Sequence, residues 1–329
     1  MAISNLATTR AGTPREDWYG MSKLKHVIES QQFTQPLLTE LFQRSRGMER
    51  VVARGGTLEY QNKILASLFY QPSTRTRFSF EAAMYRLGGK VLSTEQAGVF
   101  SSEIAGEQVE DSIRIIANYS DVIVVRHPQV GGAQRAAQVS TVPIINAGDG
   151  EGGQHPTQAL LDLYTIYRER PLVGLSVAIV GELDRGRTAR SLAYLLAKFE
   201  RVKIFFVAPA ELQMKPDILE YLDEHGVRYE LESEIDRCIG EVDVVYLTRI
   251  RPERVLLERG LDEHGLKRYA VDSALLRKMK SDALIMHPLP RTVELDKAVD
   301  DDPRALYFRQ AANGLYVRMA LLTMLLENE

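Results

Sequence analysis

Short apolar segments rich in Val, Ile, Phe and Tyr recur along the chain between longer stretches in which apolar residues fall at helical spacing. This alternation is typical of parallel strands joined by helices. The segments predicted to be strands are 64–70, 121–126, 142–146, 176–180, 202–207, 242–247 and 283–286. Helical patterns between and after them cover 78–87, 157–169, 188–199 and 314–329. The chain is therefore predicted to be an α/β protein.

The predicted strands fall into two groups, separated by the helix that Pro171 ends. A chain of 329 residues is also long for one domain, so two domains are predicted. We expect each to be a mainly parallel sheet flanked by helices. The first would contain residues 1–157 together with 311–329, the second residues 172–310, and a helix over 158–171 would bridge them.

Charge and hydropathy exclude several classes of partner. The chain has 41 Lys and Arg against 44 Asp and Glu, and the resulting net charge of −3 gives no general attraction for nucleic acid or an anionic membrane. No apolar run approaches the roughly 20 residues that a membrane span needs, and residues 1–20 lack the apolar stretch of a signal peptide. We predict no nucleic-acid partner and no membrane partner. Any anion must be bound by a local cluster.

The cysteine and histidine content bears on redox compartment and metals. Cys238 is the single cysteine, so an internal disulfide is excluded, and the six histidines show no metal-ligand spacing. These features predict a cytoplasmic location and no bound metal.

The clearest chemical motif follows the strand 64–70. The segment QPSTRTR, from Gln71 to Arg77, leads into the helix 78–87. Hydroxyls, forked guanidiniums and the free N–H groups of a helix N-terminus therefore converge, and phosphate is the natural ligand of such a group. The alternative is a Ser or Thr that only caps the helix, beside solvated arginines.

Polar residues also follow the next two strands. Arg126 ends the strand 121–126, and His155 and Gln158 lie near a helix start after a glycine-rich run. Open α/β sheets bind ligands at these strand ends, and side chains three residues apart near a helix start can point the same way. Taken singly, each residue is more often a structural hydrogen-bonding group. Three polar strand ends in one half of the chain favour a site.

The second half contains a near match to the phosphate loop of nucleotide hydrolases, from Gly181 to Thr188. Arg187 stands where that loop has Lys, and no later strand ends in a clear magnesium-binding Asp, which argues against nucleotide hydrolysis. The segment also lacks GxGxxG, which weakens a dinucleotide site. Together with Arg249 and Arg251 beyond a later strand, Arg187 suits a small dicarboxylate. A solvated arginine face is the alternative.

These motifs, in this order, resemble the aspartate and ornithine carbamoyltransferase family. The resemblance covers nearly the whole chain after about residue 25, with the segments FYQPSTRTRFSFE, VVRHP, NAGDG, QHPTQ, GRT, LTRI, HPLPR and YFRQAANGLYVRMALL. It implies transfer of a carbamoyl group from carbamoyl phosphate to an amine, without a metal or organic cofactor. It also implies a homotrimer with active sites shared between subunits, to which regulatory chains could be joined.

The resemblance assigns roles to individual positions. Residues matching the carbamoyl phosphate site are Ser73, Thr74, Arg75, Thr76, Ser101, Arg126, His155, Gln158 and, through its backbone, Leu289. The catalytic candidates among them are Arg75, Thr76, Arg126 and His155.

The acceptor is expected to be acidic. Arg187 and Arg249 match the arginines that bind the two carboxylates of the amino acid. Ornithine enzymes usually have Cys where Pro288 stands, and the cationic chain of ornithine would be repelled by Arg249 and Arg251. The resemblance thus implies use of L-aspartate to form N-carbamoyl-L-aspartate, a step of pyrimidine biosynthesis.

Two positions depart from the family. In a loop that the neighbouring subunit supplies, Ala105 stands where a Lys is usual, and Arg251 stands where aspartate enzymes commonly have Gln. One hypothesis is that Arg251 replaces the lost charge, so that aspartate is still used. A second is that the pocket accepts another acidic amine, and a third is a catalytically idle paralogue kept as a binding or regulatory subunit. The segment 150–153 is also one residue longer than usual, which could shift His155.

Overall fold

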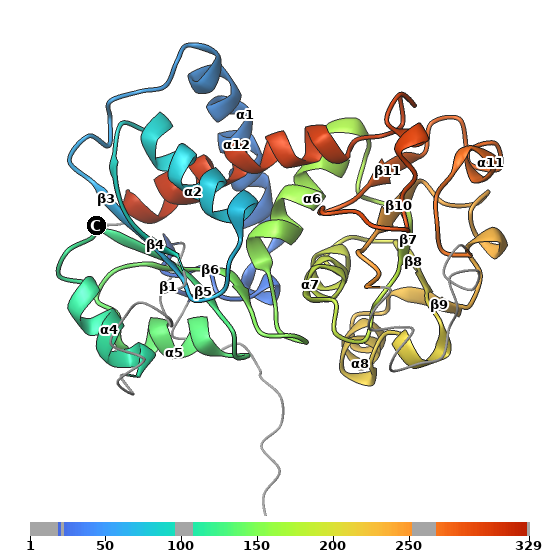
Figure 1. Ribbon diagram of the computed structural model, residues 1–329, viewed down its shortest axis with the longest axis horizontal. Helices are drawn as coiled ribbons and strands as arrows, with labels where there is room; N and C mark the ends of the chain where they lie inside the picture. The colour runs from blue at the N-terminus through green and yellow to red at the C-terminus, as the bar shows by residue number, and fades with distance from the viewer. Residues whose placement is uncertain (1–18, 21–22, 96–107, 252–267, 328–329) are drawn as a thin grey trace, which may run out of the picture.

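The computed structural model describes residues 19–20, 23–95, 108–251 and 268–327. They form two lobes, each built on a parallel sheet, with two long helices between them (Figure 1). The predicted α/β class and its two parallel sheets are confirmed.

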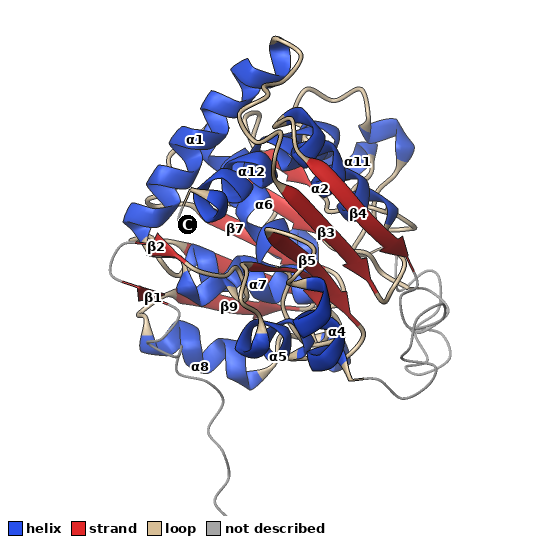
Figure 2. Ribbon diagram, turned by 90° about the vertical axis from the view of Figure 1, so that its left-hand side faces the viewer, coloured by secondary structure: helices blue, strands red, loops and turns tan. Residues whose placement is uncertain are grey.

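The first sheet has the strand order β4-β3-β5-β6, and every pairing is parallel. Its strands are β3 (Ile64–Phe69), β4 (Lys90–Glu95), β5 (Val122–His127) and β6 (Ile144–Asp149). Helices cover both faces, which is why β3, β5 and β6 are almost entirely buried. The helices of this lobe are α1 (Gln35–Ala53), α2 (Thr74–Arg86), α4 (Val109–Ile116) and α5 (Gly132–Val139). Figure 2 shows α4 and α5 on one side of β3 and β5 and α1 on the other.

The second sheet has the order β11-β10-β7-β8-β9 and is also parallel throughout. Its strands are β7 (Ser176–Val180), β8 (Lys203–Val207), β9 (Arg228–Glu232), β10 (Val244–Leu247) and β11 (Leu284–Met286). Its helices are α7 (Arg187–Leu196), α8 (Pro216–Glu224) and the short α11 (Ser273–Leu276). Short elements elsewhere are β1 (Tyr19–Gly20), β2 (Lys23–Leu24), η2 (Ser30–Gln32), η4 (Ala210–Leu212), η5 (Ile235–Arg237) and η6 (Lys297–Val299).

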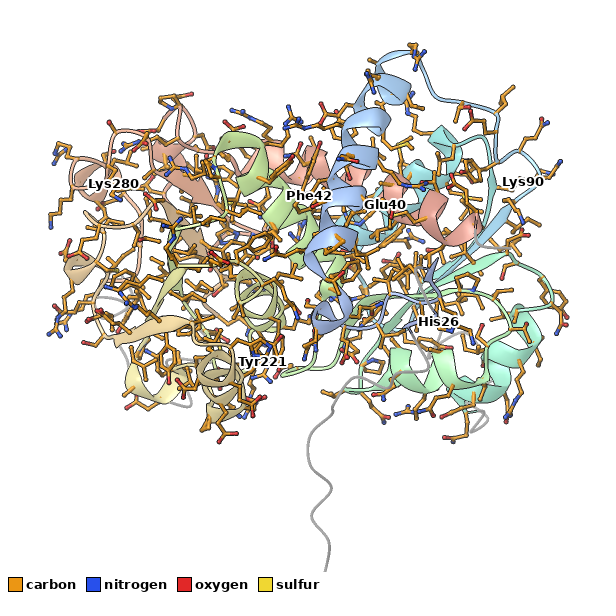
Figure 3. All side chains as sticks on the ribbon, turned by 180° about the vertical axis from the view of Figure 1, so that it is seen from behind. His26, Glu40, Phe42, Lys90, Tyr221 and Lys280 are labelled. Atoms are coloured by element: carbon orange, nitrogen blue, oxygen red, sulfur yellow. The ribbon has the colours of Figure 1, made fainter. Side chains whose placement is uncertain are left out.

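Two helices join the lobes. Helix α6 (Pro156–Glu169) packs against α7 of the second lobe, and α12 (Tyr307–Leu326) packs against α1, α2 and α6. Phe42 of α1, labelled in Figure 3, places its ring 5.5 Å from that of Tyr164 on α6. Because α6 is buried along most of its length, it provides a rigid connection between the sheets.

The predicted strands are found within three residues at each end, but two strands of the main sheets are missing from the prediction. Both β4 and β9 lie at a sheet edge, where exposed polar side chains break the apolar pattern. Two helices begin earlier than predicted: α2 at Thr74 rather than 78, and α12 at Tyr307 rather than 314. The first turn of α2 is Thr74-Arg-Thr-Arg77, without an apolar residue, so an apolar pattern could not reveal it. In α12 the apolar residues Tyr307 and Phe308 are followed by Arg309 and Gln310, which interrupt the pattern. None of the helices in the described part of the chain is both long and apolar enough to cross a bilayer.

Candidate active site

A cavity of about 790 Å³ lies between the two sheets, bordered by residues at or after the carboxyl ends of six strands: β3, β5, β6, β7, β10 and β11. These are carboxyl ends of parallel strands, the edge at which open α/β sheets bind ligands. Every described residue that the sequence nominated for the site lines this cavity: Ser73, Thr74, Arg75, Thr76, Arg126, His155, Gln158, Arg187, Arg249, Arg251 and Leu289. Ser101 and Ala105 lie outside the described residues.

Three helices begin at the cavity. The first residues of α2, α6 and α7 are Thr74, Pro156 and Arg187, and none of the preceding residues caps its helix through a side-chain hydrogen bond. The Ser73 hydroxyl therefore does not perform the capping role that was the alternative explanation of the QPSTRTR segment. Three positive helix ends make this cavity attractive for an anion.

On the side of the first sheet, positive charge is not balanced by carboxylates. The Arg126 guanidinium donates to the Ala147 carbonyl at 3.0 Å, and Arg75 donates to the Leu289 carbonyl at 2.8 Å. Burial, followed by the charges of Arg187 and Arg75, lowers the pKa of Arg126 to about 9. Within the described residues, neither Arg75 nor Arg126 forms an ion pair with Asp or Glu. A bound anion would reduce the repulsion between these positive side chains.

His155 is held neutral beside these arginines. Its side chain is buried, and burial together with Arg126, Arg187 and Arg318 lowers its pKa well below the usual value. Its backbone N–H donates to the Ser191 hydroxyl at 2.9 Å. A neutral imidazole carries one N–H and can donate one hydrogen bond to a ligand.

Gly148 allows Arg126 and His155 to approach each other. It has a φ of 107°, and a Cβ there would lie 2.9 Å from an Arg126 nitrogen and 3.2 Å from the His155 ring. Only glycine adopts this positive φ without strain and also leaves room for the Arg126 and His155 side chains.

A buried carboxylate orients Gln158. Asp162 accepts hydrogen bonds from Gln158 (2.8 Å), Gln310 (2.6 Å) and the Tyr246 hydroxyl (2.7 Å). Burial raises the pKa of Asp162 to about 6 against the opposing effect of these donors. Because the Gln158 amide nitrogen is engaged, its carbonyl oxygen can serve as an acceptor in the cavity.

The loop after β11 is held by a second buried carboxylate. The Leu289 N–H donates to His287 Nδ1 at 2.7 Å, so the proton of this imidazole is on Nε2, which donates to Glu294 at 2.9 Å. Glu294 also accepts from the Ile250 N–H at 3.1 Å and from the backbone and hydroxyl of Thr292. Burial acts to raise the pKa of Glu294, but these donors lower it. Glu294 therefore ties the Leu289 loop to the loop that carries Arg249 and Arg251.

On the side of the second sheet, Arg251 and Arg185 are paired with carboxylates. Arg251 contacts Glu182 through Nε at 3.2 Å and one terminal nitrogen at 2.9 Å, and contacts Glu151 through the other at 2.7 Å. Although burial opposes it, the two carboxylates raise the pKa of Arg251. Arg187 donates to the Asp149 carbonyl at 3.3 Å, and burial lowers its pKa while Asp149 and Glu151 oppose this.

Several residues that line the cavity are not predicted from the sequence, among them Glu151, Glu182, Arg185 and Arg318. Arg318 is buried, donates to the Ser79 hydroxyl at 2.9 Å and has its pKa lowered to about 10 by burial. A lone arginine within the apolar run of the last helix was the available signal. Glu182 and Arg185 lie in the segment 181–188, from which the sequence pattern singles out Arg187 alone.

The fold and cavity define a class: a two-lobed α/β protein whose interlobe cleft is built to bind anions on both sides. In the described ranges, no three His, Cys, Asp or Glu side chains are placed to hold a metal ion. Two family models match the chain. The aspartate/ornithine carbamoyltransferase carbamoyl-P binding domain matches residues 25–168, and the Asp/Orn binding domain of the same family matches residues 173–325. The chain belongs to the aspartate/ornithine carbamoyltransferase family.

Individual relatives agree with this membership. The chloroplastic aspartate carbamoyltransferase of Arabidopsis thaliana is 52% identical over 306 residues, covering 92% of this chain and 78% of that protein. The catalytic subunit of the Methanocaldococcus jannaschii aspartate transcarbamoylase superimposes with a TM-score of 0.85 at 43% identity, covering 93% of this chain and 99% of the other. The Trypanosoma cruzi enzyme in complex with N-(phosphonacetyl)-L-aspartic acid gives 0.86 at 39% identity, covering 91% and 95%.

Proposed function

We propose that this protein transfers the carbamoyl group of carbamoyl phosphate to the amine of L-aspartate, giving N-carbamoyl-L-aspartate and phosphate, in pyrimidine biosynthesis. The observation that carries the proposal is the convergence in one cleft of an unbalanced cationic cluster from the first sheet and four arginines from the second. A phosphorylated donor and a dicarboxylate acceptor match these two sides. Relatives crystallised with carbamoyl phosphate and with aspartate support the same pair of substrates.

The first sheet would bind the donor. The hydroxyls and N–H groups from Ser73 to Thr76 would hold the phosphate at the start of α2, with the guanidinium of Arg75 beside it. Ser101 of the neighbouring subunit would complete this side. The Gln158 carbonyl oxygen and the Leu289 carbonyl would accept from the carbamoyl amino group. These contacts would orient the carbonyl carbon towards the acceptor side of the cleft.

The chemical step would be attack of the unprotonated amine on the carbamoyl carbon. The new C–N bond forms, the C–O bond to phosphate breaks, and the proton lost by the amine passes to the departing phosphate. Negative charge develops on the carbonyl oxygen, where Thr76, Arg126 and neutral His155 would act as donors. Such preorganised donors are each worth about 3 to 4 kcal/mol in better-studied enzymes. His155 would act as a donor, because a neutral imidazole with a lowered pKa is a weak base.

The second sheet would bind the acceptor. Arg187 and Arg249 would bind its two carboxylates, and Arg251 would supply the positive charge that Ala105 no longer provides. The competing proposal is that the pocket serves another acidic amine, because the Arg251 guanidinium is already paired with two carboxylates.

We also propose a division of the chain and a quaternary state. Residues 1–157 and 311–329 would form the donor domain, 172–310 the acceptor domain and 158–171 the bridge; the packing of α12 on α1 and α2 supports this division. A homotrimer is supported by exposed apolar side chains beside the open edge at β4: Phe78, Tyr85 and Leu92. Because the M. jannaschii relative is described as a catalytic subunit, regulatory chains are a further proposed partner.

The cytoplasmic location is likewise a proposal. The buried, unpaired Cys238 is compatible with a reducing compartment, whereas the Arabidopsis relative is described as chloroplastic.

The test is an assay of phosphate release from carbamoyl phosphate with L-aspartate, repeated with a panel of other acidic amines. Formation of N-carbamoyl-L-aspartate at the highest kcat/KM of the panel supports the proposal. A higher kcat/KM with another acidic amine would show that this amine, and not aspartate, is the acceptor. No turnover with any amine would favour the idle paralogue.

A further inference from the structure

Glu151 connects the two sides of the cleft. It lies in the loop between β6 and α6 of the first lobe, and its carboxylate reaches two arginines of the second lobe, Arg251 at 2.7 Å and Arg185 at 3.6 Å. The adjacent Gly152 N–H donates to the Arg185 carbonyl at 3.1 Å, which fixes this loop against the second lobe. A carboxylate of the chain itself therefore lies among the arginines that line the acceptor side.

The two carboxylates on Arg251 differ in how firmly they are held. The Glu182 side chain is only 5% exposed, and it accepts from the Arg251 backbone N–H at 2.6 Å as well as from the guanidinium. The Glu151 side chain is 53% exposed and meets the one terminal nitrogen that Glu182 leaves available. Glu182 thus fixes the plane of the guanidinium, and Glu151 accepts from the remaining terminal nitrogen, on the side of the first lobe.

We propose that Glu151 is a displaceable counter-ion of Arg251, which an acceptor carboxylate replaces when it binds. This inference rests on the proposed function and makes Glu151 a determinant of acceptor affinity and specificity. An acceptor with a second carboxylate breaks the pair between Arg251 and Glu151 but forms a new ion pair with Arg251. An amine without a second carboxylate leaves Arg251 paired with Glu151. The charge of Glu151 also acts on Arg187, so the same exchange changes the balance at both arginines.

The expected effect is modest because the pair is partly exposed. Ion pairs of this kind contribute little to stability, and removal of the competing carboxylate should tighten acceptor binding about two- to fivefold. The variant Glu151→Gln keeps the size of the side chain and removes its charge. Glu169→Gln is a matched control: it removes an exposed carboxylate that pairs with Arg309 at 2.8 Å, on residues that do not line the cavity.

The experiment measures binding of succinate, a dicarboxylate without an amine, by calorimetry on the full-length protein in the presence of inorganic phosphate. Glu151→Gln should lower the Kd of succinate two- to fivefold, and Glu169→Gln should not. In an Arg251→Gln background, Glu151→Gln should have a clearly smaller effect, because the pair with Arg251 no longer exists and only the charge acting on Arg187 and Arg185 is removed. In steady-state assays the KM for aspartate should fall with Glu151→Gln while the KM for carbamoyl phosphate stays the same.

Three results would overturn the inference. Unchanged or weaker succinate binding to Glu151→Gln would show that Glu151 does not compete with the acceptor and serves at most to hold the lobes together. An effect of undiminished size in the Arg251→Gln background would show that Glu151 does not act through Arg251. Failure of succinate to bind the wild-type protein would overturn both this inference and the proposed acceptor, whereas the first two results leave the proposed function standing.

Discussion

The two sides of the cleft differ in how the charges of their arginines are balanced. On the donor side, Arg75 and Arg126 donate to backbone carbonyls at 2.8 and 3.0 Å, and burial keeps the pKa of Arg126 at about 9. On the acceptor side, Arg251 is paired with Glu182 and Glu151. The donor side therefore holds positive charge that a bound anion would balance, whereas Arg251 on the acceptor side must exchange one carboxylate for another.

This difference predicts different energetics for the two substrates. A preorganised, partly desolvated cationic cluster gains much from an anion and needs little rearrangement. Exchange at an exposed ion pair gains little, but it selects ligands that carry the matching charge. The donor side should therefore dominate catalysis, and the acceptor side should mainly determine which amine is used.

The strongest test of the donor side is Arg75→Ala. Loss of this guanidinium should lower kcat/KM at least about 100-fold, the usual effect of removing one preorganised donor. The side chain is exposed, so the melting temperature should hardly change. Turnover and thermal unfolding would be measured together. Arg86→Ala on the same helix is the matched control, since Arg86 is exposed and does not line the cavity. Full turnover by Arg75→Ala would remove the phosphate assignment.

Glu294→Gln tests whether the two sides share a support. Both oxygens of Glu294 accept hydrogen bonds, from His287, Thr292 and Ile250. The amide of the variant has a single oxygen and cannot accept all of them. We expect kcat/KM to fall about tenfold and the free energy of unfolding to fall by about 1 to 3 kcal/mol. Denaturant unfolding and the KM of each substrate would be measured. A rise in both KM values is expected, and a change confined to one substrate would show that the two loops are independent.

Arg251→Gln tests the acceptor side alone. The KM for aspartate should rise about fivefold, the loss expected for a partly exposed charge pair. The KM for carbamoyl phosphate should stay within error. Addition of Ala105→Lys should restore aspartate binding. Normal aspartate binding by the single variant would contradict the compensation hypothesis.

Asp162→Asn concerns the carboxylate that orients Gln158, and its predicted effect is on stability rather than on turnover. The pKa of Asp162 is raised to about 6 from 3.8, so the folded protein takes up this proton first as the pH falls. The stability gained by protonation of Asp162 in the folded state is fully present below about pH 4 and is lost as the pH rises through 6. Between pH 7 and pH 5, wild type should gain about 1 kcal/mol relative to Asp162→Asn. Denaturant unfolding at both pH values measures this, and a constant difference would exclude the raised pKa.

Much of the architecture was predictable from local pattern. The buried strands of both sheets read as short apolar runs, because a strand covered on both faces has no polar side. Edge strands β4 and β9 could not be found in this way, since their exposed faces carry polar residues. Strand-end motifs similarly revealed Arg126 and His155, since ligands bind at the carboxyl ends of parallel strands.

The sequence by itself determined the α/β class, the two sheets and the residue types that face the cleft, because periodicity and strand-end motifs are local properties. Only the tertiary structure decided which of those charges are balanced. Glu151 and Glu182 are separated from Arg251 by 100 and 69 residues, and their pairing depends on how the two lobes meet. Likewise, burial rather than residue type lowers the pKa of His155 and raises that of Asp162. Charge balance and desolvation depend on neighbours in space, which a linear pattern does not contain.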